Sequence, residues 1–201
     1  MPIHRDLKVV FLHIPRTGGT TVEKILGLYE PWPAVRVDWL RGPYDRNGES
    51  VQLQHLPLAE LSKVAGEDFT DWYKFAFVRN PWDRLVSAFS FMKGPKAGFP
   101  QFVERVQSVV ATGDRIAGKN CHLRPQTDYA LDELDFLGRF ETFERDLTRV
   151  LEEIGVPPGD IPHAHKTKRE HYSQYYDETT RRRVADIYAR DIEMLEYHFG
   201  E

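Results

Sequence analysis

The chain has 201 residues, of which 41% are hydrophobic and 29% are charged, a composition typical of soluble globular proteins and unlike that of disordered chains. A chain of this length can bury enough surface to fold around one core, so we expect a single domain over residues 1–201. Its 27 basic and 31 acidic side chains leave a net charge of −4, which excludes a global basic surface for nucleic acid.

The cysteine content and the apolar segments of the chain bear on its compartment. The lone cysteine, Cys121, cannot form an internal disulfide, which fits a reducing environment. The first residues contain no long apolar segment, and no stretch approaches the roughly 20 apolar residues needed to cross a bilayer. We therefore expect a cytoplasmic protein without a membrane span.

The first elements in chain order are a strand, a glycine loop and a helix. Residues 8–13 (KVVFLH) are rich in β-branched and aromatic types, which predicts a buried strand. The loop 15–21 (PRTGGTT) follows, and apolar residues then recur at helical spacing. Residues 29–50 contain three prolines and two glycines without a clean period, so we expect an irregular surface segment that influences substrate choice.

A second strand and helix follow the same pattern. Residues 57–65 predict a short helix with proline in its first turn, and residues 73–78 (YKFAFV) predict a buried strand. Asn80 and Pro81 then suit the N-cap and first position of a helix. The remaining expected elements are a helix at 99–111, a strand at 136–140, a helix at 143–154 and one long helix at 177–199. This alternation predicts an α/β, P-loop-like three-layer fold with a central parallel sheet flanked by helices.

The glycine loop has the character of a phosphate cradle. Glycines let backbone N–H groups approach an anion, and an arginine with three threonines adds charge and hydroxyl groups. The candidate residues are Arg16, Thr17, Gly18, Gly19, Thr20 and Thr21. The pattern GxxxxGK[ST] is absent, so the loop is not a Walker A sequence. A plain glycine turn between strand and helix is the alternative.

A second candidate anion site lies in residues 75–89 (FAFVRNPWDRLVSAF). Arg79 stands where the strand meets the helix, and Ser87 lies two turns into that helix on the face of Asn80. A guanidinium and a hydroxyl so placed can share one phosphate. The alternative is that Arg79 only pairs with Asp83.

In this order the two segments resemble the nucleotide-binding motifs of sulfotransferases that use 3′-phosphoadenosine 5′-phosphosulfate, with the carbohydrate (family 2 type) branch the most similar. The resemblance implies that residues 16–21 hold the 5′-phosphosulfate and that Arg79 and Ser87 hold the 3′-phosphate. The residues that would close over the nucleotide are Lys166, Thr167 and Lys168. Arginine stands at position 16 where the family commonly has lysine, which keeps the charge but spreads it over a planar fork.

The resemblance also implies a general base at His55, in the segment QLQHLP. An imidazole with an ordinary pKa of about 6.5 can accept a proton from a sugar hydroxyl at neutral pH. A surface or helix-capping histidine is the alternative. The pair Cys121 and His122 and the pair His163 and His165 each offer too few ligands for a zinc site, so no metal is expected.

We therefore expect in-line transfer of a sulfuryl group from 3′-phosphoadenosine 5′-phosphosulfate to a hydroxyl acceptor, a saccharide or a glycolipid, with adenosine 3′,5′-bisphosphate as product. His55 would deprotonate the hydroxyl, and Arg16 with the loop amides would stabilise the transferring group. Two alternatives stay open. One is a P-loop-like ATP-dependent kinase or nucleotide hydrolase, which magnesium dependence would reveal. The other is a non-catalytic nucleotide- or glycan-binding module, which turnover would exclude.

Overall fold

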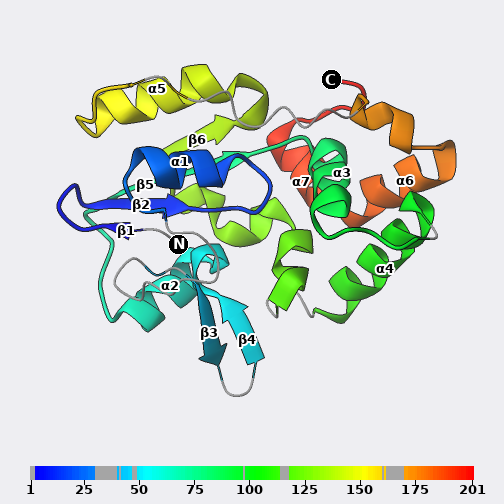
Figure 1. Cartoon of the computed structure of the whole chain (residues 1–201), viewed down its shortest axis with the longest axis horizontal. Coiled ribbons are helices and arrows are strands. Elements are labelled where there is room, and N and C mark those ends of the chain that lie inside the picture. Colours follow the sequence, from blue (N-terminus) through cyan, green and yellow to red (C-terminus); the bar gives the residue numbers. More distant parts are fainter. Residues whose placement is uncertain are drawn as a thin grey trace.

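The chain folds as an α/β structure around one central sheet (Figure 1). The computed structural model describes residues 3–29, 40, 42–46, 49–96, 98–113, 118–159, 161 and 170–201. The sheet has the order β1-β2-β5-β6, with β1 at Ile3–His4, β2 at Val9–Leu12, β5 at Tyr73–Val78 and β6 at Phe136–Arg139. The strands β2, β5 and β6 are parallel, as predicted.

The sheet is mixed, and the expectation of an all-parallel sheet is wrong at its first edge. Strand β1 runs antiparallel to β2. The two strands are joined by a tight turn in which Lys8 adopts a positive φ of 52° and its N–H donates to the carbonyl of Arg5 over 3.1 Å. A connection this short can only return the chain antiparallel to itself, because a parallel return needs a long crossover.

Helices cover both faces of the sheet because the strand side chains alternate between two apolar clusters. Val9 and Phe11 face a cluster that includes helices α1 (Gly19–Ile25) and α5 (Phe143–Glu153). Val10 and Leu12 face the opposite cluster, which includes α2 (Leu58–Ala65). All four residues of β2 are buried, as expected for a strand covered on both sides.

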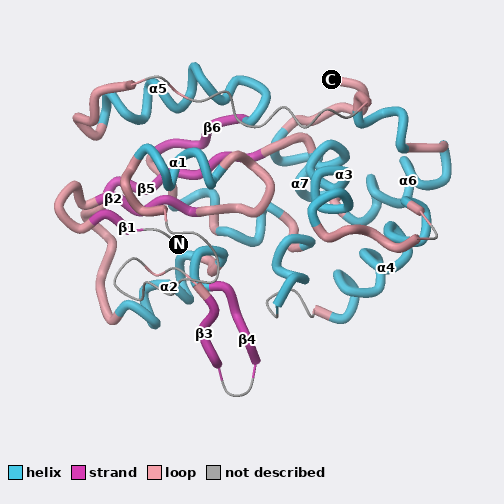
Figure 2. Tube along the Cα trace, viewed as in Figure 1, coloured by secondary structure: helices cyan, strands magenta, loops and turns pink. Residues whose placement is uncertain are grey.

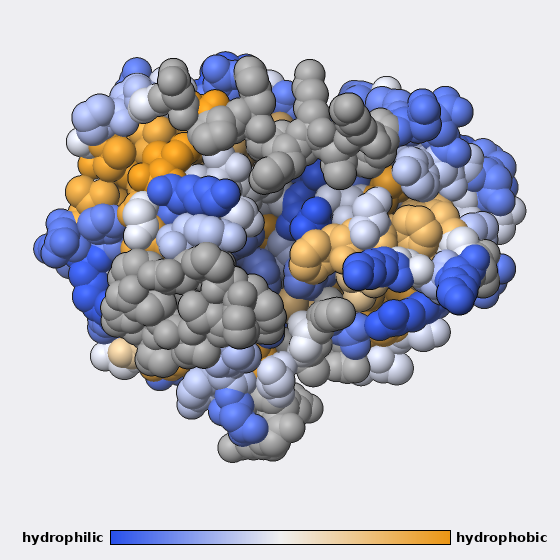
Figure 3. Space-filling view, in the orientation of Figure 1, coloured by the Kyte–Doolittle hydropathy of each residue, from blue (hydrophilic) through white to orange (hydrophobic). Residues whose placement is uncertain are grey.

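A group of helices with its own apolar cluster stands beside the sheet (Figure 2). Its members are α3 (Pro81–Phe91), α4 (Phe99–Thr112), α6 (Glu178–Ile187) and α7 (Ala189–Leu195). The helix α3 starts as predicted, with the Asn80 side chain accepting from the Trp82 N–H over 3.1 Å and proline at the first position. The Asn80 amide also donates to the carbonyl of His198 over 2.9 Å, which ties α3 to the end of the chain. On the face shown in Figure 3, hydrophilic side chains line the rim of this group of helices, and an apolar patch lies between them.

The expected long helix at 177–199 is interrupted at Tyr188, where φ is −112° and ψ is 29°. Two buried side chains, one at the break and one after it, contact the same segment. The Tyr188 hydroxyl donates to the carbonyl of Leu123 over 2.9 Å, and the Asp191 carboxylate accepts from the N–H groups of Gln126 and Thr127 over 2.8 and 2.9 Å. The break lets both side chains reach these partners, which an apolar pattern cannot reveal.

The expected irregular segment at 29–50 contains regular structure where it is described. Strands β3 (Pro43–Arg46) and β4 (Glu49–Gln52) form an antiparallel hairpin that projects from the body of the molecule (Figure 1). Residue Pro57 precedes α2 as its N-cap and is not in its first turn. Short 3-10 helices lie at Leu53–His55 (η2), Gly118–Leu123 (η3), Gln126–Tyr129 (η4), Leu131–Glu133 (η5), Phe140–Thr142 (η6) and Tyr172–Tyr175 (η7). None of the helices in the described ranges is long and apolar enough to cross a membrane.

Candidate functional site

The glycine loop between β2 and α1 depends on both of its glycines, for different reasons. Gly18 has a φ of 92°, a left-handed conformation that side chains disfavour. A Cβ atom on Gly19 would overlap the ring of His13, and one on Gly18 would contact the ring of Phe143. The loop therefore needs glycine at 18 for its backbone angle and at 19 for the close approach of His13.

The threonines of the loop divide between structural and accessible positions. The Thr17 hydroxyl is fully buried and donates to the carbonyl of Ile14 over 2.8 Å, which stabilises the loop itself. Thr21 is also buried, whereas Thr20 is exposed and lines a cavity. Of the three predicted hydroxyl contacts, Thr20 is therefore the one that faces open space.

The two predicted anion motifs meet in space. Arg16 Nε donates to Ser87 Oγ over 3.1 Å, and Arg79 Nη1 donates to the carbonyl of Arg16 over 3.1 Å. Arg16 also has a positive φ of 71°, a costly conformation for a residue with a side chain. The structure thus places Arg16, Arg79 and Ser87 in one contiguous group.

Arg79 is held in place by two further partners. Its guanidinium forms an ion pair with Asp83, with Nη2 and Oδ2 2.6 Å apart, and lies over the ring of Phe140 at 3.8 Å from the centroid. The pairing with Asp83 that the sequence offers as an alternative is therefore present. It orients the guanidinium next to the Arg16 carbonyl, and the binding role of Arg79 stays a prediction.

His55 lies in η2 and is buried, with its ring oriented by the glycine loop. Its Nδ1–H donates to the carbonyl of His13 over 2.8 Å, which leaves Nε2 as the proton acceptor. Burial, and then the neighbouring imidazoles of His13 and His122, hold the pKa of His55 well below 6.5. The ring is therefore neutral at physiological pH and carries an unprotonated Nε2, as a general base requires.

A cavity of about 550 Å³ connects the glycine loop to His55. Its lining residues are His13, Pro15, Arg16, Thr20, Glu23, Tyr29, Gln52, Gln54, His55, Phe91, Gly118 and His122. Both residues predicted to act in chemistry, Arg16 and His55, therefore border the same space. The predicted closing residues at 166–168 lie outside the described part of the chain.

Several residues at the cavity have no predicted role in the sequence. His13 Nδ1 and Glu23 Oε1 form a buried hydrogen bond 2.5 Å long. Phe91 lies one helical turn after Ser87, and its ring stands 4.5 Å from the Arg16 guanidinium and stacks on His122. The spacing of four residues from Ser87 is a signal that points to Phe91, since such residues share a helix face. No comparable signal links His13 to Glu23.

Comparison with known proteins identifies the family of the chain. Residues 2–198 match the model of the sulfotransferase family. Carbohydrate sulfotransferase 14 of Danio rerio is 22% identical over 182 residues, which cover 77% of this chain and 48% of that protein. The chain thus spans about half the length of this curated relative, and no solved structure matches it significantly. The chain therefore belongs to the sulfotransferase family, and its similarity within that family is to the carbohydrate sulfotransferases.

Proposed function

We propose that the protein transfers a sulfuryl group from 3′-phosphoadenosine 5′-phosphosulfate to a hydroxyl group of a saccharide. Membership of the sulfotransferase family supports the reaction class, and the similarity to a carbohydrate sulfotransferase supports a saccharide acceptor. The observation that carries the proposal is the shared cavity. Arg16 of the glycine loop and the buried His55 line the same space, so a donor and an acceptor can meet there.

The donor side of the cavity suits a nucleotide with two separate anionic groups. In the proposed complex the backbone N–H groups of the glycine loop face the phosphosulfate, and Gly18 supplies the left-handed angle that gives the loop its shape. Hydrogen bonds connect Arg16 to both Ser87 and Arg79. This connected set of donors can hold the second anionic group of the nucleotide. In the proposed complex these residues orient the donor and offset its charge.

The acceptor side combines amide and aromatic side chains. Gln52 and Gln54 line the cavity close to His55 in sequence, and amides can donate to and accept from sugar hydroxyls. Phe91 exposes half of its surface at the cavity and offers an apolar face. Few polar groups placed among aromatic rings are typical of small-molecule sites.

The proposed step is an in-line displacement at sulfur. The acceptor oxygen forms a bond to sulfur while the bond from sulfur to the phosphate oxygen breaks, and adenosine 3′,5′-bisphosphate leaves. The hydroxyl proton passes to Nε2 of His55, whose ring is held by the His13 carbonyl. Arg16 stabilises the negative charge that develops on the leaving oxygen, and its contacts with Ser87 and Phe91 hold it in position.

Calorimetric titration with adenosine 3′,5′-bisphosphate tests the donor site. We expect metal-independent binding that weakens markedly for adenosine 5′-phosphate, because the 3′-phosphate contacts would be lost. Arg79→Ala should weaken binding about 10–100-fold, the worth of hydrogen bonds to a charged group. Arg190→Ala is the matched control, since Arg190 is exposed and contacts Met194 on α7. A preference for magnesium-ATP would contradict the proposal and favour the kinase alternative.

A further inference from the structure

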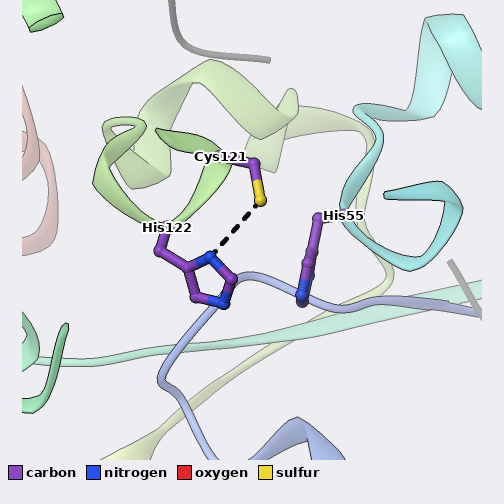
Figure 4. A group of neighbouring side chains, drawn as sticks. All are labelled: His55, Cys121 and His122. Atoms are coloured by element: carbon purple, nitrogen blue, oxygen red, sulfur yellow. Dashed lines mark hydrogen bonds between the residues drawn. The ribbon is translucent and has the colours of Figure 1, made fainter. Parts of the chain in front are cut away.

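Three metal-ligand side chains converge at the wall of the cavity. His55 from η2 meets Cys121 and His122 from η3, and their ligand atoms all lie within 4.8 Å of one another (Figure 4). Adjacent residues Cys121 and His122 alone offer too few ligands for a transition metal. The fold supplies the third ligand from a distant part of the chain.

The side chains are oriented as metal ligands usually are. His55 Nδ1 donates to a backbone carbonyl, the outer contact that typically fixes the ring of a metal-bound histidine and leaves its other nitrogen for the ion. His122 Nδ1 lies 3.4 Å from Cys121 Sγ, and its ring is held by stacking on Phe91 with centroids 4.9 Å apart. Small side-chain movements would bring all three atoms into bonding distance of one ion.

The chemistry of the donors selects the class of ion. A thiolate with two imidazoles favours Zn²⁺ and similar transition metals over magnesium or calcium, which prefer oxygen ligands. His55, His122 and Gly118 also line the cavity, so a fourth coordination position would open toward it. Three protein ligands with one open position form a known pattern for zinc.

We propose that His55, Cys121 and His122 bind a Zn²⁺-class ion, and that this ion inhibits the enzyme by occupying Nε2 of His55. On binding, the Cys121 thiol proton passes to solvent as the sulfur–metal bond forms. An imidazole nitrogen bonded to the ion cannot accept a proton from an acceptor hydroxyl. Metal binding stands on the cluster alone, whereas the inhibition rests on the proposed function.

Cobalt titration of the purified protein tests the binding, because thiolate ligation to Co²⁺ produces a near-ultraviolet charge-transfer band. Cys121 is the single cysteine of the chain, so the band can arise from this residue alone. We expect saturation at one equivalent of Co²⁺ and displacement of the band by Zn²⁺. His122→Gln should weaken binding more than about tenfold, since it removes a direct ligand. His171→Gln, at an exposed histidine outside the cluster, should leave the titration unchanged.

Turnover tests the inhibition separately. One equivalent of Zn²⁺ should abolish wild-type turnover, and a chelator should restore it. Cys121→Ser should keep basal turnover and tolerate Zn²⁺, and Cys121→Ala replaces it if thermal unfolding shows that the serine variant is misfolded. A missing charge-transfer band in the wild type would overturn the site. A band without Zn²⁺ inhibition of an active enzyme would overturn the inhibitory role, and a band in an inactive protein would support the site while contradicting the proposed function.

Discussion

The molecule joins a central parallel strand to a helix twice, and the two junctions are made differently. After β2 the N-cap position of α1 is Gly18, which brings no side chain, and the next residue lies against His13. After β5 the N-cap of α3 is Asn80, whose side chain bonds to the Trp82 N–H and to the His198 carbonyl. The first junction borders the cavity through Arg16 and Thr20. The second is braced by side chains on several sides.

The difference between the two junctions indicates different roles: the first serves the proposed reaction, and the second stabilises the fold. A helix start without a capping side chain lets a ligand approach the backbone closely, whereas a capped helix start uses its polar side chain for hydrogen bonds within the protein. Arg79 is the exception at the second junction, because Asp83 and Phe140 hold its guanidinium beside the Arg16 carbonyl of the first junction, where it serves the proposed donor site. We therefore expect changes near the first junction to affect chemistry most, and changes at the second to affect stability most.

The largest expected effect is that of removing the proposed base. His55→Ala should lower turnover about 10²–10⁴-fold, the usual contribution of general acid–base catalysis. Affinity for adenosine 3′,5′-bisphosphate should stay unchanged, which calorimetry would check. His171→Ala serves as the control for loss of a histidine. Full turnover by the His55 variant would refute its role as base.

Gly19→Ala should disturb the first junction itself. Its Cβ would overlap the His13 ring, and overpacking of this kind costs about 1–3 kcal/mol of unfolding free energy. Because the His13 carbonyl orients His55, turnover should fall as well. Gly159→Ala is the matched control, since nothing lies within 4 Å of the added atom. Equal behaviour of the two variants in thermal unfolding and turnover would argue against a tight first junction.

At the second junction, Asn80→Ala should act on stability. Loss of the N-cap costs about 1 kcal/mol, and loss of the bond to His198 adds to it. Chemical denaturation should show this decrease, with Asn80→Ser recovering part of it through its hydroxyl. Donor affinity should change far less than in Arg79→Ala. A loss of affinity as large as that of Arg79→Ala would contradict the division between the two junctions.

The smallest expected effect concerns the pH dependence of turnover. Protonation of His55 removes the base, and the pKa of His55 is lowered. The acid limb of kcat/KM should therefore lie below pH 6.5. The assay contains a chelator to exclude metals. The His122 imidazole is one of the groups that lower this pKa. His122→Gln should therefore shift the limb toward higher pH. An acid limb above pH 7 in the wild type would contradict a depressed pKa.

Local rules account for the parts of the fold that the sequence predicts well. The apolar run at Tyr73–Val78 and the Asn80-Pro81 start of α3 each depend on neighbouring residues, and both are confirmed. The break at Tyr188 depends on partners in residues 123–127, so the continuous helical pattern gives no warning of it. Strand β1 is too short to carry a period, and its antiparallel pairing depends on the turn before β2.

The candidate site likewise contains contacts that the sequence predicts and contacts that only the fold reveals. The resemblance to sulfotransferases implies that Arg16 and Ser87 serve one ligand, and their side chains are in hydrogen-bond contact. The contact between His55 and the His13 carbonyl joins residues 42 positions apart, and their spacing in the sequence does not predict this contact. The grouping of His55 with Cys121 and His122 likewise arises only when the 3-10 helices fold against each other.

The bond from Asn80 to the His198 carbonyl links residues 118 positions apart. During synthesis the chain emerges from its N-terminal side, so both anion motifs leave the ribosome long before this partner exists. The start of α3 must wait for that late segment before its bracing is complete. Nascent chains stalled before His198 should consequently bind adenosine 3′,5′-bisphosphate less well than released protein, even though every predicted donor-binding residue has already been made.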